Sequence, residues 1–222
     1  MNQINILCYG DSNTWGYVPQ SDHSLPKARY PRDVRWPGVL QILLGNKFHI
    51  IEEGLNSRTT NLDYAPPPDR NGKTYLPPCL YSHAPLDLVV LSLGGNDTKT
   101  YFNRTTEQIT KGLADLVDII RSSPYGSDMR QAPKVLITTC VIPFPFIEEY
   151  QDEHGEKFML GAVKKSHELV GLYEKLAIEK GCYFLDLSKD VIPSKIDGVH
   201  YDETAHKKCA DLVSVKIKEI FI

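Results

Sequence analysis

A serine, an asparagine, an aspartate and a histidine stand in short polar motifs that follow apolar runs. Ser12 ends the motif Gly-Asp-Ser, Asn96 lies in Gly-Gly-Asn-Asp, and Asp197 and His200 begin and end Asp-Gly-Val-His. A neutral imidazole can take the proton of a serine hydroxyl, and a carboxylate can hold the second ring nitrogen. We therefore expect acyl transfer, with Ser12 as nucleophile, His200 as base and Asp197 as its orienting partner.

This chemistry also needs hydrogen-bond donors for the negative charge that develops on the carbonyl oxygen of the substrate. The candidates are the main-chain N–H groups of Ser12 and Gly54 and the side-chain amide of Asn96. A glycine at position 54 would let the backbone approach the substrate without a side chain in the way. We expect these three residues to form an oxyanion hole.

The elements that must bring these motifs together alternate along the chain. Apolar runs typical of strands cover residues 4–9, 48–53, 86–93, 135–140 and 183–187. Most are continuous rather than alternating, which favours parallel strands covered on both faces. Helical periodicity lies between and after them, over residues 36–45, 105–123 and 163–180 and beyond Asp202. The pattern predicts an α/β fold with a parallel sheet, which would gather the polar motifs at the carboxyl ends of its strands.

Two segments lack this periodicity. Residues 64–78 are rich in proline, and we expect an irregular surface loop there. Residues 141–156 are a second candidate loop. Long loops often shape binding sites, so we expect residues 64–78, together with the Trp-Gly-Tyr-Val-Pro run after Ser12, to form walls beside the nucleophile. Such a pocket would favour short acyl groups.

Length, composition and charge limit the classes of protein to which this chain can belong. The 222 residues fit one domain, 1–222, with 41% hydrophobic residues and a formal net charge of -3. This charge gives no basis for nucleic-acid binding, and no stretch is long enough to span a membrane. Five cysteines without a Cys-x-x-Cys pair, behind an N-terminus unlike a signal peptide, favour reduced thiols and a cytoplasmic location.

Other polar residues near the motifs have simpler interpretations. We expect Asp11 to hold its own loop through backbone amides and Asp97 to organise the loop or helix start that follows it. Arg58 is compatible with either a loop salt bridge or a substrate contact. His206 falls inside the last helical pattern, where we expect it at the surface. The aromatic residues Trp15, Tyr17 and Trp36 are expected in the core or at an interface.

The chain resembles the SGNH hydrolase superfamily, the GDSL esterases and lipases, in four motifs that occur in the same order. These are Gly-Asp-Ser at 10–12, Gly54 in EEGLNSRTT, Gly-Gly-Asn-Asp at 94–97 and Asp-Gly-Val-His at 197–200. The resemblance spans residues 10 to 200 and implies a flavodoxin-like three-layer α/β/α sandwich with a five-stranded parallel sheet in the order 2-1-3-4-5. It also implies a serine esterase without a cofactor or metal. The runs GDSNTWGYVP and GLNSRTT are similar to the arylesterase-like branch, whose members cleave small esters and can be oligomeric. Asn13 departs from that branch, where an apolar residue is common.

Alternatives stay open at this point. The leading hypothesis is an esterase for small esters such as acetylated sugars or aryl esters, and a lysophospholipase or thioesterase of the same superfamily is the first alternative. A metal-dependent phosphoesterase would need several converging His and carboxylate ligands, and only His200 stands in a motif. A non-catalytic flavodoxin-like module would leave the coincidence of Ser, Asn, Asp and His unexplained. Neither the acyl length nor the choice between hydrolysis and acyl transfer follows from the residues.

Overall fold

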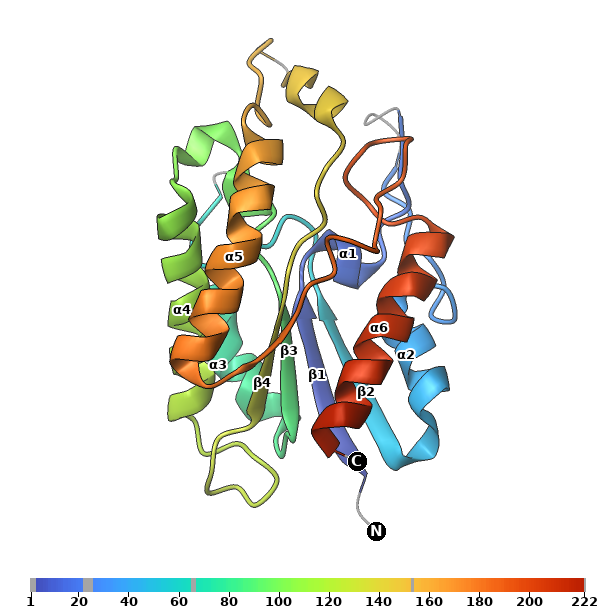
Figure 1. Cartoon of the computed structure of the whole chain (residues 1–222), viewed down its shortest axis with the longest axis vertical. Coiled ribbons are helices and arrows are strands. Elements are labelled where there is room, and N and C mark those ends of the chain that lie inside the picture. Colours follow the sequence, from blue (N-terminus) through green and yellow to red (C-terminus); the bar gives the residue numbers. More distant parts are fainter. Residues whose placement is uncertain (1–2, 22–25, 65–66, 153, 222) are drawn as a thin grey trace.

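The computed structural model describes residues 3–21, 26–64, 67–152 and 154–221. Five parallel strands form one sheet in the order β2-β1-β3-β4-β5 (Figure 1). The strands are β1 Ile4–Gly10, β2 Phe48–Gly54, β3 Leu88–Ser92, β4 Lys134–Thr138 and β5 Tyr183–Leu185. The predicted α/β class and strand order are therefore confirmed, although β3, β4 and β5 are shorter than their apolar runs.

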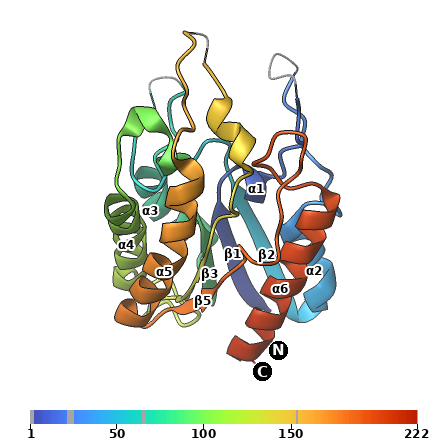
Figure 2. The same cartoon turned by 45° about the horizontal axis from the view of Figure 1, so that its top comes forward.

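Helices cover both faces of the sheet and make the three layers visible in Figures 1 and 2. On one face lie α3 Gly72–His83, α4 Thr106–Ser122 and α5 Ala162–Lys180, and on the other lie α2 Trp36–Leu44 and α6 Glu203–Phe221. Each face has its own apolar core, one including Leu113, Leu116 and Tyr173 and the other including Trp36 and Val213. Burial on both faces explains the continuous apolar runs of the central strands.

Local sequence signals set the ends of several helices. At the start of α4 the Thr105 side chain accepts from the Gln108 N–H and the Gln108 side chain accepts from the Thr105 N–H, which makes the predicted capping box. The α5 helix ends at Gly181 in the left-handed conformation. Asp202 caps α6 by accepting from the Ala205 N–H at 2.9 Å.

The α3 helix corrects the expectation of an irregular loop over residues 64–78. Asn71 caps it by accepting from two main-chain N–H groups, and the helix continues through Pro77 and Pro78. Proline in a helix interior removes an i→i−4 hydrogen bond and costs about 3 kcal/mol or more. Tertiary burial outweighs that cost because Leu76, Cys79 and Leu80, which lie on one face of the helix, are fully buried in the core.

The first three strands end level with one another. Gly10 of β1 pairs with Gly54 of β2 on one side and with Ser92 of β3 on the other. The segments that follow these strands therefore leave the sheet at the same edge. Directly after β1 comes α1 Ser12–Trp15, a single turn that Figure 1 shows above the end of that strand. The fold thus places the Gly-Asp-Ser motif at the centre of this edge.

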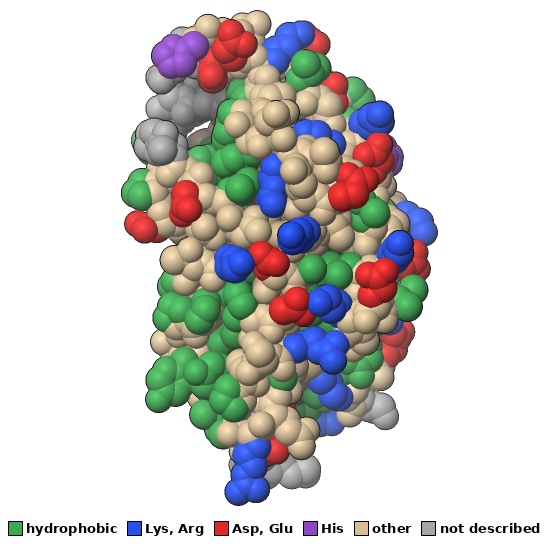
Figure 3. Space-filling view, turned by 90° about the vertical axis from the view of Figure 1, so that its left-hand side faces the viewer, with side chains coloured by type: hydrophobic (Ala, Val, Ile, Leu, Met, Phe, Trp, Pro, Cys, Tyr) green, Lys and Arg blue, Asp and Glu red, His purple; other side chains and the backbone are tan. Residues whose placement is uncertain are grey.

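Charges of both signs lie side by side on the face that α3, α4 and α5 cover (Figure 3). Lys73 contacts Asp115 at 2.8 Å and Lys180 contacts Asp118 at 2.6 Å. In the part of the chain that the structure describes, no helix is both long and apolar enough to cross a membrane.

Candidate active site

Ser12 stands at the turn between β1 and α1. Asp11 caps the turn by accepting from the Asn13 N–H at 3.0 Å, as expected for a residue that holds its own loop. Gly10 is required there, because a Cβ atom at this position would lie 2.0 Å from Thr14 Oγ1. Ser12 is thereby held at the first position of α1, with only 8% of its surface exposed.

Three side chains from the two ends of the chain form one hydrogen-bonded line. Ser12 Oγ lies 2.9 Å from His200 Nε2, and His200 Nδ1 lies 2.7 Å from Asp197 Oδ2. An ionised carboxylate only accepts, so Nδ1 carries the ring proton and Nε2 is free to accept from the serine hydroxyl. This is the tautomer that a general base for Ser12 requires.

The Asp-Gly-Val-His loop folds around the carboxylate of Asp197. Its second oxygen accepts from the main-chain N–H groups of Val199 at 3.1 Å and His200 at 2.9 Å. Gly198 makes this tight turn with φ of 72°, a left-handed conformation that favours glycine. Burial raises the pKa of Asp197, but the hydrogen bond and charge of His200 and the two N–H donors outweigh it, so the net shift is downward. Asp197 is therefore ionised at neutral pH and can support a charged imidazole.

Two further residues, Tyr17 and Asn13, contact His200 or the residues beside it, and the sequence did not predict these contacts. The Tyr17 ring packs against the imidazole of His200 with centroids 4.3 Å apart. Asn13 bridges to both residues that flank His200, because its Nδ2 donates to Val199 O at 3.3 Å and its Oδ1 accepts from the Tyr201 N–H at 2.9 Å. The polar side chain at position 13 thus joins the nucleophile turn to the histidine loop, and its departure from the arylesterase-like pattern was the only signal for it.

Asn96 lies after β3 at the same edge and lines the same cavity as Ser12. Its Nδ2 donates to Arg58 O at 3.1 Å, which ties it to the segment after β2. Asp97 makes a second tie by accepting from the Thr60 N–H at 3.0 Å and from Arg104. Burial raises the pKa of Asp97 to about 6 against the opposing effect of these donors. Asp97 thus organises the loops, as expected, and fixes the segment that carries Asn96.

The position of Gly54 does not match its predicted role. Leu55 N–H donates to Gly10 O on β1, and because successive N–H groups of a strand point to opposite sides, the N–H of Gly54 points away from β1. Gly54 is absent from the cavity wall, and a Cβ there would lie 2.1 Å from Trp15 N. The glycine serves the close packing of α1 on β2. The cavity wall instead contains Ser57, whose φ of 66° is left-handed.

The side chain of Arg58 donates hydrogen bonds to main-chain carbonyl groups at the ends of β1 and β2. Its side chain is 2% exposed and donates to Gly10 O at 3.0 Å and to Glu53 O. The guanidinium carbon lies 4.1 Å from the ring centroid of Tyr9 and 5.3 Å from that of Tyr75, close enough for cation–π contacts with both. Neither of the two alternatives, a salt bridge and a substrate contact, describes this residue, which connects the ends of β1 and β2.

His206 corrects the expectation of a surface histidine. It is fully buried where α6 packs on α2, and its Nδ1 accepts from the Trp36 N–H at 3.2 Å. Burial lowers its pKa to about 3. The helical pattern did hold a signal, because His206 lies three residues before Cys209 and seven before Val213, both of which are buried on the same face. His206 cannot reach the cavity and is a core residue.

The cavity beside Ser12 has a volume of about 220 Å³. None of the described residues of 64–78 lines it, which corrects the expected wall from that segment, and Asn71 and Tyr75 border a second cavity instead. The candidate loop at 141–156 does contribute, together with the residues just after it. The apolar wall consists of Tyr17, Val141, Pro143, Tyr150, Phe158, Met159 and Val199.

Ligand atoms of Glu53, Cys79 and His83 lie within 4.8 Å of one another, and they form the one such His, Cys, Asp or Glu group among the described residues. His83 Nε2 lies 2.8 Å from Glu53 Oε1, so these two side chains already satisfy one another. The group sits between β2 and α3, and none of its members lines the cavity of Ser12. The described residues therefore bring no such group to the triad.

The chain is similar to a known protein family and to esterases of known structure. A model of the GDSL-like lipase/acylhydrolase family matches residues 8–208. The structure of an aryl esterase from M. smegmatis superposes with a TM-score of 0.87 at 38% identity, covering 98% of this chain and 100% of that one. The carbohydrate acetylesterase Est24 from Sinorhizobium meliloti superposes with a TM-score of 0.87 at 39% identity, covering 99% and 100%.

A more distant relative is an acetylxylan esterase from Xylanibacter ruminicola. It is 24% identical over 232 residues, which cover 97% of this chain. The chain spans only 43% of the length of that relative.

Proposed function

The chain belongs to the GDSL-like lipase/acylhydrolase family and is a carboxylic ester hydrolase, and from this premise we propose that it cleaves small, short-acyl esters with Ser12 as its nucleophile. The single observation that carries the proposal is the hydrogen-bonded line from Ser12 Oγ through His200 to Asp197, with separations of 2.9 and 2.7 Å. The names of the related aryl esterase, carbohydrate acetylesterase and acetylxylan esterase support small esters as substrates.

In the proposed mechanism Ser12 Oγ attacks the carbonyl carbon of the ester while His200 Nε2 takes its proton. The imidazolium is stabilised by the Asp197 carboxylate. Collapse of the tetrahedral intermediate breaks the bond to the alcohol, which leaves with the proton from His200. Water then attacks the acyl-enzyme, gives a proton to His200 in turn and releases the acid and Ser12.

The proposed oxyanion hole consists of the N–H groups of Ser12 and Ser57 and the side-chain amide of Asn96. Ser57 takes the place first assigned to Gly54, because Ser57 lines the cavity and Gly54 does not. Two hydrogen bonds, from the Thr60 N–H to Asp97 and from Asn96 Nδ2 to Arg58 O, join the segment after β2 to the segment after β3. They hold the donors in fixed positions, as a preorganised oxyanion hole requires.

Replacing Asn96 by alanine is expected to lower kcat on a short ester by about 10²–10³-fold, with a much smaller change in KM. An oxyanion donor acts on charge that develops only in the transition state, so its loss falls on kcat. Steady-state kinetics of the purified variant, with thermal melting as a check on folding, provide the measurement. A change confined to KM would assign Asn96 to substrate binding instead.

Acetyl and propionyl esters are expected to have higher kcat/KM than octanoyl and longer esters. The cavity of about 220 Å³ is smaller than the ~300–1,000 Å³ of sites for drug-sized ligands, and a chain that does not fit loses the near-attack geometry. A series of p-nitrophenyl esters from acetyl to dodecanoyl, assayed with wild type and Ser12→Ala, tests both the function and the size limit.

Met159→Ala provides a matched variant for this series, because Met159 lines the cavity and its truncation adds volume. We expect the preferred chain length to increase in that variant. A wild-type maximum at octanoyl or beyond would indicate an open apolar groove and would favour the lipase or thioesterase alternative.

A further inference from the structure

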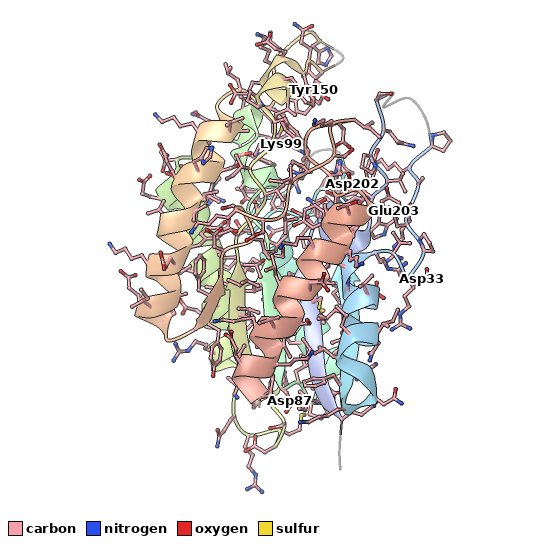
Figure 4. The ribbon with its side chains drawn as sticks, turned by 45° about the vertical axis from the view of Figure 1, so that its right-hand side comes forward. Asp33, Asp87, Lys99, Tyr150, Asp202 and Glu203 are labelled. Atoms are coloured by element: carbon pink, nitrogen blue, oxygen red, sulfur yellow. The ribbon has the colours of Figure 1, made fainter. Side chains whose placement is uncertain are left out.

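The catalytic cavity contains an ammonium group that the proposed mechanism does not use. Lys99 follows Asn96 by three residues, between the short 3-10 helices η2 Asn96–Thr98 and η3 Thr100–Phe102. Lys99 is half-buried and lines the cavity together with Ser12 and His200. Figure 4 shows Lys99 and Tyr150 at the carboxyl end of the sheet, whereas Asp87 marks the opposite end.

The contacts of Lys99 fix the ammonium without neutralising it. Its Nζ donates to Tyr64 Oη at 2.8 Å and lies 5.2 Å from the centroid of that ring. Among the described residues, no carboxylate forms an ion pair with it. An ammonium group has three hydrogens to donate, and Tyr64 accepts one of them. Two donor positions are therefore available for a ligand.

The electrostatic surroundings leave Lys99 charged at neutral pH. Burial lowers its pKa to about 8, although the charges of Asp11 and Asp97 oppose the shift and that of Lys27 adds to it. Lys27 also lines the cavity. A partly desolvated cation is costly unless a partner of opposite charge accompanies it. The wall is thus poorly suited to a purely hydrocarbon substrate and complementary to an anionic one.

Two carboxylates line the cavity wall, and each already accepts hydrogen bonds. Asp197 accepts from His200 and from two main-chain N–H groups, and Asp11 caps α1. Among the described residues neither carboxylate forms a hydrogen bond or an ion pair with Lys99, although the charge of Asp11 favours the ammonium from a distance. A direct partner for the ammonium would therefore come with the ligand.

We propose that Lys99 forms an anion-binding subsite of the catalytic cavity, which accepts a carboxylate carried by the ester substrate. This inference rests on the proposed function, because it assigns the substrate class of the same site. A lysine ammonium binds a carboxylate through charge-assisted hydrogen bonds that are stronger than neutral ones. The preferred substrates would be short esters in which the acyl or the alcohol portion bears a carboxylate close to the scissile bond.

Matched pairs of esters separate charge from shape. For the alcohol portion we compare 4-acetoxybenzoate with 4-acetoxybenzamide, and for the acyl portion monoethyl succinate with ethyl succinamate. Wild type is expected to prefer the carboxylate in at least one pair by about tenfold in kcat/KM, mainly through KM, which corresponds to about 1.4 kcal/mol. The preference should weaken with added salt and as the pH rises through about 8, where Lys99 loses its proton.

Variants assign the effect to this side chain. Lys99→Met should abolish the preference, so that kcat/KM becomes similar for the two members of each pair, whereas Lys99→Arg should retain part of it. Lys164→Met, which removes a cation that is 84% exposed on α5, should leave the preference unchanged. If Lys99→Met fails to fold, the partial preference of Lys99→Arg and the loss of the wild-type preference as the pH rises through about 8 test the same ammonium.

Two outcomes would overturn the subsite. One is the absence of a preference in wild type for either pair, and the other is an equal loss of turnover of both members in Lys99→Met, which would mean that Lys99 acts on the oxyanion. Calorimetric binding of the same pairs to Ser12→Ala measures the subsite without turnover. Tighter binding of a carboxylate there supports the subsite, and equal binding contradicts it. Undiminished turnover by Ser12→Ala would instead contradict the proposed nucleophile, so the two failures are distinguishable.

Discussion

Ser12→Ala is expected to lower kcat by at least about 10³-fold on short esters. The alanine has no oxygen to form the acyl-enzyme, and the hydrogen-bonded partners His200 and Asp197 lose the group on which they act. Members of a catalytic triad act as a unit, so losing the nucleophile removes nearly their whole contribution. Initial rates with p-nitrophenyl acetate, together with labelling of the wild type by a fluorophosphonate probe, provide the measurement.

The substitution is small and its site is held by main-chain contacts, so folding should be preserved. Asp11 and Gly10 shape the turn, and neither depends on the hydroxyl of residue 12. Thermal melting close to that of wild type would establish this. Turnover near the wild-type level in a correctly folded Ser12→Ala would show that another group is the nucleophile, and labelling of that variant would identify it.

His200→Ala is expected to be almost inactive, with a loss similar to that of Ser12→Ala. Without the imidazole nothing takes the proton of Ser12 Oγ, which lies 2.9 Å from Nε2, and nothing returns a proton to the leaving alcohol. Rates with p-nitrophenyl acetate across a range of pH provide the measurement. Exogenous imidazole gives a further check, because it can occupy the space left beside Tyr17 and partly restore turnover.

His206→Ala is the matched control, and we expect it to change stability rather than activity. Its activity per folded molecule should stay close to normal, because the ring is buried between α2 and α6. Its stability should fall, because the Trp36 N–H loses its acceptor in the core. Leaving such a group unsatisfied costs about 1–3 kcal/mol, which urea unfolding would measure. An inactive His206→Ala beside an active His200→Ala would show that the wrong histidine was assigned.

Several features of the site could be predicted because they depend on local sequence. The Gly-Asp-Ser and Asp-Gly-Val-His motifs each fix a turn with their own residues, through the cap of Asp11 and the donors to Asp197. The strand order gathers such turns at one edge of the sheet. The pairing of Ser12 with His200, which lie 188 residues apart, then follows from the fold class and the chemistry of the two side chains.

The errors share a physical cause. Gly54, His206 and the helix over 72–78 were each interpreted from local properties, namely a missing side chain, a polar ring and two prolines. Each is governed by a neighbour distant in sequence: α1 packs on Gly54, α2 covers His206, and the sheet-facing core buries Leu76 of α3. Packing energy from such contacts exceeds local propensity, and the sequence does not display it residue by residue.

The sequence by itself determined the α/β class, the identity of the candidate triad and the edge of the sheet where it forms. Periodicity and short motifs encode these features, since each depends on residues close together in the chain. Only the tertiary structure decided which walls enclose Ser12, that Asn13 joins the nucleophile turn to the histidine loop, and that Lys99 lines the cavity without an ion pair to any described carboxylate. These features depend on side-chain contacts between segments far apart in the chain, such as Asn13 with Tyr201 and Tyr64 with Lys99, which no local pattern specifies.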